Sequence, residues 1–255
     1  MDHEFGEDAL RVVSLNIEGA NHFELLPDFL SKWKPHVLCL QEAPEYVVSR
    51  IAKLLGATQT YFVPTLYREG IGGQPLLEGL ALFSTVPLVS APRHFYYVEQ
   101  KTKGLIPTYR LGDPDSYNRA LAWVSVSHGG QEYLVANFHH TWTQNGDATP
   151  EQLVDTALLL DKLQNSADFP HLLLCGDSNA PRGLKAHDLF CERYTDHIPP
   201  QVKSTLDPVL HRTAAQKLER MVDVLFATPH YDVFGVEVVS GVSDHCAIVA
   251  KVLRR

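Results

Sequence analysis

The nonapeptide His171–Asn179 constrains the fold of this 255-residue chain more than any other stretch. It begins as the apolar run His-Leu-Leu-Leu-Cys, which is typical of a strand buried on both faces. Gly176 allows the backbone to turn where the run ends, and Asp177 and Asn179 share a face if the segment stays extended. A carboxylate and an amide at a strand end can hold a phosphate and activate a water, although an ordinary Asx turn uses the same residue types.

The bulk composition is that of a globular protein, with 45% hydrophobic and 20% charged residues. No internal repeat or low-complexity linker interrupts the chain, so we predict one domain over residues 1–255. The net charge of −8 argues against a strong sequence-independent grip on nucleic acid, which relies on many Lys and Arg contacts to phosphates. It leaves room for a local basic groove, and it agrees with a carboxylate site for divalent cations.

The chain ends and the cysteines indicate the compartment. The first eight residues are acidic and lack the apolar stretch of a signal peptide, and no apolar run approaches transmembrane length. We therefore predict a cytoplasmic protein with no membrane segment and no obligate protein partner. No C-x-x-C spacing is present, so reduced thiols are expected and a zinc site is not. The four cysteines are Cys39, Cys175, Cys191 and Cys246.

Strand-like and helix-like segments alternate in the first half of the chain, which predicts an α/β fold. Amphipathic spacing predicts helices over 22–33, 43–56 and 149–164. Segment 182–200 is predicted to be mainly loop. The predicted strands are 10–17, 36–41, 61–64, 80–83, 93–98, 119–126, 132–138, 171–175, 221–227, 233–239 and 246–253.

Segment 99–118 mixes basic and aromatic residues, including Lys101, Lys103 and Arg110. Such a segment could line a groove for nucleic acid, but it is more often a solvated loop. The sequence assigns no role to Glu78 or Asp207. His211 and Arg212 could reach a phosphate, but exposure is the simpler expectation for both.

Polar side chains stand at the ends of many predicted strands, or inside one. Asp223 lies within an apolar run, and a buried carboxylate without a partner is unfavourable, so it should face a hydrogen-bond donor or a positive charge. His139 and His140 are neighbours, so at most one of them faces a given site. In chain order the polar positions are Asn16, Glu42, Arg119, Asn137 with His139, Asp177 with Asn179, Asp223, and Asp244 with His245.

The order and flanking residues of these positions resemble the endonuclease/exonuclease/phosphatase superfamily, in a small, bacterial-type form. The strings are Ser14-Leu15-Asn16, Leu40-Gln41-Glu42, Asn137-Phe138-His139, Gly176-Asp177-Ser178-Asn179 and Ser243-Asp244-His245. The resemblance implies the deoxyribonuclease I-like fold: a four-layer α/β sandwich of two packed, mainly antiparallel β-sheets flanked by helices. It places the site at one end of the sandwich.

The resemblance also implies a metal site and phosphate contacts. Glu42 matches the principal Mg²⁺ ligand, with Mn²⁺ as the alternative ion. Asn16 matches a residue beside this glutamate in the family pattern, and Asp244 matches a second acid near the metal. Arg119 and Asn137, together with Asn179, are the expected contacts to the substrate phosphate.

The remaining matched residues have catalytic roles in the family pattern. Asp177 matches the residue that orients or deprotonates the attacking water, and Asn179 matches a donor to the scissile phosphate. His245 matches a histidine that stabilises the transition state, and Asp223 matches the carboxylate that polarises it. His139 resembles a second site histidine.

These residues predict a divalent-metal-dependent phosphoesterase that hydrolyses phosphodiester bonds. Nucleic acid is the preferred substrate in this interpretation, and a small phosphoester such as a lipid head group or nucleotide is the alternative. A binding module without activity is disfavoured because Glu42, Asp177, Asn179 and His245 are all present. The Asn-Phe-His-His string lacks the tyrosine of the exonuclease III branch, so repair of abasic sites is also disfavoured.

Overall fold

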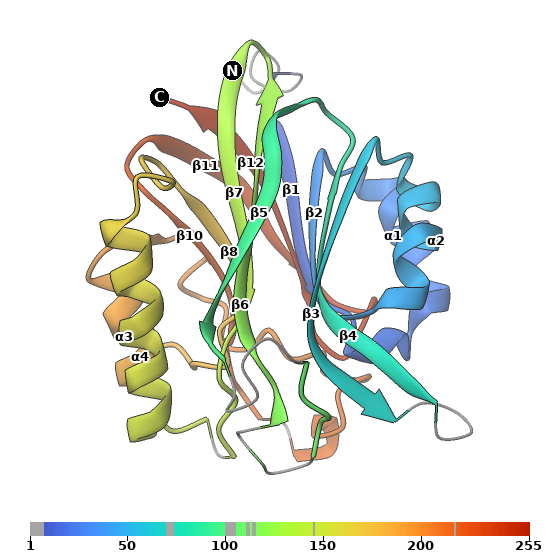
Figure 1. The fold of residues 1–255 in the computed structure, drawn as a ribbon, viewed down its shortest axis with the longest axis vertical. Coiled ribbons are helices and arrows are strands. Elements are labelled where there is room, and N and C mark those ends of the chain that lie inside the picture. The colour runs from blue at the N-terminus through green and yellow to red at the C-terminus, as the bar shows by residue number, and fades with distance from the viewer. Residues whose placement is uncertain are drawn as a thin grey trace.

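Two six-stranded β-sheets pack face to face in the computed structural model, which describes residues 8–69, 74–99, 106–110, 113, 116–144, 146–216 and 218–255 (Figure 1). The strand order is β11-β12-β1-β2-β4-β3 in the first sheet and β5-β6-β7-β8-β10-β9 in the second. The first sheet contains β1 (Leu10–Asn16), β2 (Val37–Pro44), β3 (Gln59–Glu69), β4 (Pro75–Ser84), β11 (Tyr231–Val239) and β12 (Ala247–Arg254). The second contains β5 (Leu88–Val98), β6 (Arg119–His128), β7 (Gln131–His139), β8 (Leu173–Asp177), β9 (Thr195–Asp196) and β10 (Asp223–Ala227).

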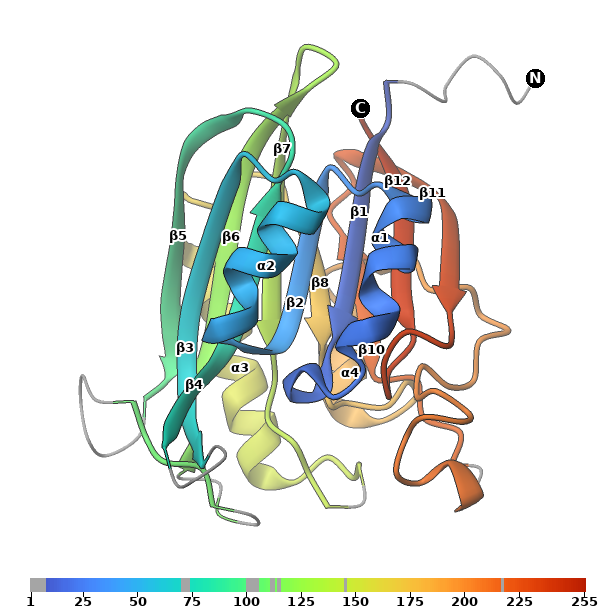
Figure 2. The same cartoon turned by 90° about the vertical axis from the view of Figure 1, so that its right-hand side faces the viewer.

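Helices cover the outer face of each sheet, so the molecule has the four layers that the resemblance implied. Helices α1 (Leu26–Trp33) and α2 (Glu45–Leu55) lie on the first sheet, and α3 (Pro150–Asn165) and α4 (Lys185–Cys191) lie on the second (Figure 2). Over the described part of the chain, none of the helices has the length and apolar character needed to cross a bilayer. One hydrophobic cluster contains side chains of both sheets, and the single domain over residues 1–255 stays a prediction.

The strand directions explain why distant polar residues meet. In the described sheets, β1 with β2 and β7 with β8 are the parallel pairs, and their neighbours run antiparallel to them. The mainly antiparallel prediction is therefore confirmed. Strands β6, β10 and β12 begin where their antiparallel partners β7, β8 and β1 end. Seven strand termini consequently meet at one end of the sandwich.

The predicted element boundaries were largely confirmed for the helices. Helix α2 ends at Leu55 because Gly56 adopts φ +68°, and Thr149 caps α3 by accepting a hydrogen bond from the Gln152 backbone. Helix α1 starts only at Leu26, with Pro27 in its first turn, where a missing N–H is tolerated. The loop prediction for 182–200 was wrong over α4, Lys185–Cys191.

Strands β3 and β4 are longer than the short predicted strands at 61–64 and 80–83. The β3–β4 register shifts between Pro64 and Leu66, so the proline is accommodated at an irregularity and the strand continues beyond it. Gly176 also differs from its predicted role as a turn. It lies within β8 at φ +145°, and a Cβ atom there would lie 2.0 Å from the carbonyl oxygen of Phe138 in β7. The glycine is needed for close approach of two strands.

Asn137 forms a polar bridge between the sheets and does not reach the end of the sandwich. Its side chain is fully buried, accepts a hydrogen bond from Gln41 Nε2 at 2.6 Å and donates to the carbonyls of Leu40 and Ala81. These bonds occupy the amide within the protein core. The structure therefore does not bring Asn137 together with the other predicted phosphate contacts.

We expect Asn137→Leu to lower the free energy of unfolding by about 3 kcal/mol, because three hydrogen bonds, to Gln41, Leu40 and Ala81, are lost inside the core. Urea unfolding measures this change directly. A variant with unchanged stability and a raised KM would instead indicate that Asn137 contacts the substrate.

His140 is fully buried, with its two ring nitrogens bonded to the hydroxyls of Tyr97 and Thr156 at 3.0 and 2.9 Å. Burial, with a smaller contribution from the charge of Arg119, lowers the pKa of His140 to about 3. The folded state therefore disfavours the proton that the unfolded chain takes up below pH ~6.5. Stability is lost as the pH falls through that value.

Between pH 7.5 and 5.5 we expect His140 alone to reduce the free energy of unfolding by about 1.4 kcal/mol. Urea unfolding of the wild-type protein and of His140→Gln at both pH values tests this expectation. The variant should lose less stability than the wild type over this interval, whatever its stability at pH 7.5. Equal losses would contradict the assignment.

Candidate active site

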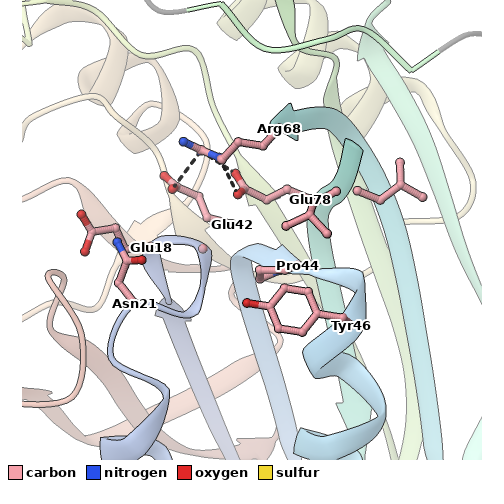
Figure 3. A pocket seen from close by; sticks show the side chains of 10 residues that line it. Glu18, Asn21, Glu42, Pro44, Tyr46, Arg68 and Glu78 are labelled. Carbon is pink, nitrogen blue, oxygen red and sulfur yellow. Dashed lines mark hydrogen bonds and ion pairs between the residues drawn. The ribbon is translucent and has the colours of Figure 1, made fainter. Parts of the chain in front are cut away.

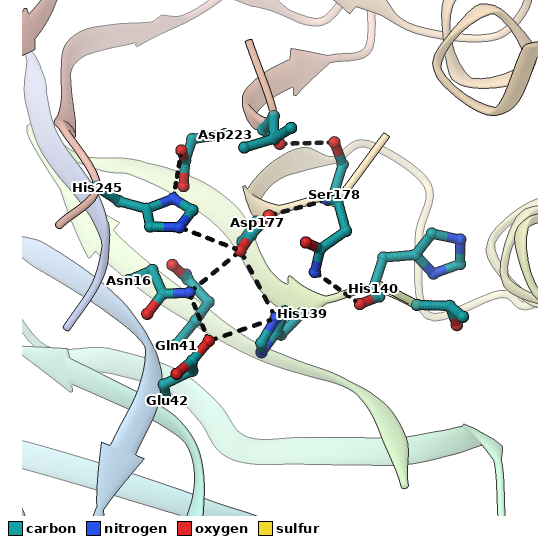
Figure 4. Close-up of polar contacts among 12 residues, drawn as sticks. Asn16, Gln41, Glu42, His139, His140, Asp177, Ser178, Asp223 and His245 are labelled. Carbon is teal, nitrogen blue, oxygen red and sulfur yellow. Dashed lines mark hydrogen bonds and ion pairs between the residues drawn. The ribbon is translucent and has the colours of Figure 1, made fainter. Parts of the chain in front are cut away.

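Five polar side chains from five strand ends or adjoining loops converge at one end of the sandwich (Figure 4). Asn16 Nδ2 lies 3.0 Å from Glu42 Oε1 and 3.1 Å from Asp177 Oδ2. The same Asp177 oxygen lies 3.6 Å from His139 Nε2 and 3.9 Å from His245 Nε2. The structure therefore brings Asn16, Glu42, His139, Asp177 and His245 together, across both sheets.

His245 and Asp223 form a buried pair behind this cluster. His245 Nδ1 lies 2.8 Å from Asp223 Oδ2, which provides the partner that the buried carboxylate was expected to have. Burial alone would favour a neutral ring, but Asp223 and Asp177 raise the pKa of His245 well above its usual value. The imidazolium is therefore held with Nδ1 toward Asp223 and Nε2 toward Asp177, so it can donate a proton on the open side.

Asp177 is almost fully buried, and burial raises its pKa despite the opposing effect of His245. Its Oδ1 accepts a hydrogen bond from the Asn179 backbone at 2.8 Å. Asn179 adopts φ +47°, so the segment is not extended here and the two side chains do not share a face as predicted. The amide of Asn179 instead donates to the carbonyl of His140 at 3.0 Å.

His139 and His140 point to opposite sides of the chain end, as predicted from their adjacency. His139 faces Glu42 and Asp177, whereas the His140 ring packs in the core. Burial lowers the pKa of His139, although Asp177 opposes this effect. Arg119 is buried and stacks on the ring of Tyr117, and its Nη1 lies 3.4 Å from the His139 carbonyl, so its charge lies beside the cluster.

Glu42 has an unusual backbone and a second set of partners. Its φ of +51° is strained for a residue with a side chain, and such strain is concentrated at functional sites in proteins. Burial opposes its charge, but His139, the Asn16 hydrogen bond and Arg68 together lower the pKa of Glu42. Arg68 Nη2 lies 3.8 Å from Glu42 Oε2, where both residues line a pocket (Figure 3).

Arg68 was not among the predicted site residues, and Glu78 had no predicted role. Arg68 Nε and Nη2 donate to the two carboxylate oxygens of Glu78 at 2.9 and 2.8 Å, and Glu78 is 3% exposed. Both residues lie inside the paired strands β3 and β4, where Arg68 faces Leu76, two residues from Glu78. A diagonal cross-strand pair leaves no signal at a strand end, but a predicted β3–β4 hairpin register would have revealed it.

Thr205 and Asp207 connect the strand carrying Asp223 to the loop carrying Asp244 and His245. Thr205 Oγ1 accepts hydrogen bonds from the backbone of Val222 and Asp223, both at 3.0 Å. The Asp207 carboxylate accepts one from Gly241 at 2.6 Å, and its backbone donates to the carbonyl of Asp244 at 2.7 Å. These bonds hold the loop that carries His245 in position beside the strand that begins at Asp223.

Asp244 lies on the outer side of the cluster, near His211. Its Oδ2 is 4.0 Å from His211 Nε2, so the expectation that His211 is exposed was wrong, while Arg212 is exposed as expected. Burial, together with the carboxylates of Glu18 and Glu42, raises the pKa of Asp244 to about 7. Three carboxylates thus lie near one another at this edge.

The donor set fits a hard divalent cation at Glu42 and Asp244. Carboxylate oxygens are the ligands that Mg²⁺ prefers, and a divalent ion would offset both the burial of Asp244 and the nearby carboxylates that raise its pKa. Asn16 fits less well as an oxygen ligand, because its Oδ1 accepts a hydrogen bond from Glu18 N at 3.0 Å. In this arrangement Asn16 instead holds Glu42 and Asp177 together through Nδ2.

A two-sheet α/β sandwich with carboxylates and histidines at one end is the architecture of the deoxyribonuclease I-like proteins. The sequence model of the Endonuclease/Exonuclease/phosphatase family matches residues 13–245. The chain therefore belongs to this family, whose members act on phosphoester bonds. No curated protein sequence matches the chain significantly.

Solved structures share the fold at low sequence identity. An endonuclease/exonuclease/phosphatase from Beutenbergia cavernae has a TM-score of 0.71 and 19% identity, over 97% of this chain and 72% of that chain. The human Nocturnin catalytic domain with bound sulfate has a TM-score of 0.71 and 18% identity, over 97% and 94%. A mannosyl-6-phosphatase from Bacteroides thetaiotaomicron has a TM-score of 0.66 and 15% identity, over 96% and 99%.

Proposed function

We propose that this protein is a divalent-metal-dependent hydrolase of phosphoesters. The observation that carries this proposal is the convergence of Asp177 with the His245–Asp223 pair, His139 and the Asn16–Glu42 pair within hydrogen-bonding or ion-pair distance. A carboxylate with a raised pKa beside a protonated imidazole is suited to moving a proton and stabilising negative charge in one step.

Asp177 is the candidate proton acceptor for the attacking water. Its Oδ1 is held by the Asn179 backbone, so Oδ2 keeps a fixed direction toward the open end of the sandwich. His245 donates through Nε2 to the oxygens of the phosphate, with its charge maintained by Asp223. Arg119 adds positive charge near His139, and the donor role of the Asn179 amide stays a prediction.

Glu42 and Asp244 are the residues that would hold the metal ion. When bound, a Mg²⁺ or Mn²⁺ ion would supply positive charge to the phosphate and the leaving oxygen. Two protein contacts orient the Glu42 carboxylate: Asn16 donates to Oε1, and the Arg68 guanidinium lies near Oε2.

The substrate class divides into the two alternatives that the sequence left open. The nucleic-acid alternative was based on the basic segment around Lys101, Lys103 and Arg110. The two lysines lie outside the described residues. Arg110 forms an ion pair with Asp113, at 2.6 Å, so its charge is partly neutralised locally. We therefore favour a small phosphoester, while oligonucleotides remain the necessary comparison.

Hydrolysis of mono- and bis-nitrophenyl phosphate and of a short single-stranded DNA, with Mg²⁺, Mn²⁺ or EDTA, tests the proposal. We expect metal-dependent release of nitrophenol that EDTA abolishes. Cleavage of the DNA at a comparable rate would restore nucleic acid as the substrate. Turnover that persists in EDTA would contradict the metal dependence, and no turnover of any ester would contradict the proposed function.

A further inference from the structure

A second cluster of histidine, cysteine and carboxylate side chains lies on helix α4 and strand β9, and it shares no residue with the catalytic cluster. It consists of His187 and Cys191 in α4 and Asp196 in β9. One nitrogen, sulfur or oxygen atom from each residue lies within 4.8 Å of the other two. The proposed catalytic mechanism assigns no role to these three residues.

The helix places two of the three side chains on one face. His187 and Cys191 are four residues apart, so their side chains are neighbours on the surface of α4. His187 is 3% exposed and packs against the ring of Phe226 in β10, at a centroid distance of 5.5 Å, whereas Cys191 is exposed. The cluster therefore combines a buried imidazole with an open side at the thiol, through which an ion can enter.

Sheet pairing brings the third side chain to this face of the helix. Asp196 lies opposite Phe226 where β9 pairs with β10. Arg182 Nε and Nη2 donate to Asp196 Oδ2 at 3.0 and 2.6 Å, and the Ile198 backbone donates to Oδ1 at 2.9 Å. These contacts hold the carboxylate without help from His187, in the way that hydrogen bonds orient the ligating carboxylates of metal sites.

The distances within the cluster match a shared metal ion. His187 Nε2 lies 3.4 Å from Asp196 Oδ2, which is long for an N–H···O hydrogen bond, whose usual length is about 2.9–3.0 Å. Zinc bond lengths of about 2.0–2.3 Å in a tetrahedron separate neighbouring ligand atoms by roughly 3.3–3.7 Å. Cys191 Sγ is 4.0 Å from the same nitrogen, and the single torsion of this exposed side chain allows the sulfur to come closer.

A cysteine nucleophile activated by a histidine is the alternative use of this cluster. Cys191 Sγ also lies 3.4 Å from His187 Nδ1, so the groups follow one another as in a cysteine–histidine–aspartate triad. Burial, together with the carboxylates of Asp196 and Asp188, raises the pKa of Cys191 to about 11, whereas reactive thiols have a lowered pKa. The same carboxylates that disfavour a bare thiolate favour a bound divalent cation.

The ligand types select zinc over magnesium. Thiolate and imidazole ligands suit Zn²⁺, whereas Mg²⁺ requires oxygen ligands in near-ideal octahedral geometry. The cluster thus differs from the Glu42–Asp244 pair, which offers carboxylates alone. The sequence prediction against a zinc site was based on the absence of C-x-x-C spacing, and this cluster joins a helix to a strand by a different spacing.

We propose that His187, Cys191 and Asp196 bind one Zn²⁺ ion, with a water molecule as the fourth ligand, and that the ion connects α4 to β9. On binding, the Cys191 thiol releases its proton and the thiolate sulfur bonds to the metal. The site lies outside the proposed catalytic machinery, so the proposal stands or falls independently of the proposed function.

Titration of the protein with Co²⁺, followed by optical absorption, tests the site directly. A thiolate bound to Co²⁺ gives a charge-transfer band, so Co²⁺ bound at the carboxylates of Glu42 and Asp244 does not contribute to it. We expect one equivalent of Co²⁺ to produce the band and Zn²⁺ to displace it. Cys191→Ser, an exposed substitution, should abolish the band. Absence of the band in the wild type, or its survival in Cys191→Ser, would overturn the site.

A pair of carboxylate variants tests the third ligand. Asp196→Asn should weaken Co²⁺ binding by at least about 100-fold, because loss of even an outer partner of a ligand reduces metal affinity about 10–100-fold. Asp188→Asn removes an exposed carboxylate of the same helix and should weaken binding by less than about fivefold. Equal effects of the two substitutions would overturn the assignment of Asp196.

Alkylation of Cys191 by iodoacetamide, measured by mass spectrometry, tests the site in the wild-type protein. Of the four cysteines, Cys191 is the exposed one, so it should react first. We expect saturating Zn²⁺ to slow its alkylation by at least about tenfold, because the sulfur is then bonded to the metal, and Mg²⁺ to have no effect. Equal alkylation rates with Zn²⁺ and with Mg²⁺ would contradict zinc binding at this thiol.

Discussion

Asp177→Asn is expected to reduce kcat on nitrophenyl phosphate by about 10³-fold, because an amide cannot accept the proton of the attacking water. The substitution keeps the shape of the side chain and an oxygen for the Asn179 backbone N–H. The new amide nitrogen would face Asn16 Nδ2, which donates to Asp177 Oδ2, so we expect a modest fall in the unfolding midpoint that the burial of a neutral group partly offsets. Initial rates at saturating metal, together with urea unfolding, measure both quantities.

Asp161→Asn is the matched control for this substitution. Asp161 lies exposed on α3, away from the cluster, and the same change of charge there should leave kcat unchanged. If Asp177→Asn retained near-wild-type kcat while Asp161→Asn did as well, Asp177 would not be the proton acceptor.

His245→Ala is expected to reduce kcat by about 10²–10³-fold, because the transition state loses a charged hydrogen-bond donor. It should also lower the free energy of unfolding by about 3 kcal/mol, since it leaves the carboxylate of Asp223 buried without its partner. Kinetics and urea unfolding of the same preparation separate the two effects.

The double variant Asp223→Asn/His245→Ala distinguishes catalysis from folding. Removing the buried charge should recover much of the lost stability, because the uncompensated carboxylate is gone. Activity should remain as low as in His245→Ala. Recovery of activity along with stability would show that His245 serves the fold alone.

The predictable part of the site is the part that stands at strand ends. Glu42 and Asp177 follow apolar runs and His245 directly precedes one, so their positions could be inferred from the order of polar residues along the chain. The pairing of Asp223 with a donor could be inferred from the unfavourable burial of a lone carboxylate. The structure brings these residues together, and their chemical roles stay predictions.

Other contacts could not be inferred because they depend on which strands lie side by side. Asn137 stands near a strand end in the sequence, yet its amide bridges the two sheets. Arg68 and Glu78 meet diagonally across β3 and β4, and Asp207 binds the backbone of Gly241, 34 residues away. Each of these contacts joins segments whose distance apart is set by sheet pairing and packing.

The sequence by itself determined the strand-rich α/β class, the family and most of the polar residues that meet at one end of the sandwich, because apolar runs and polar strand ends are local properties of the chain. Only the tertiary structure decided how these residues face one another. Hydrogen bonds and packing between the sheets place Glu42 with one oxygen toward Asn16 and the other toward Arg68. The cluster of His187, Cys191 and Asp196 exists for a similar reason, because the pairing of β9 with β10 brings Asp196 to helix α4.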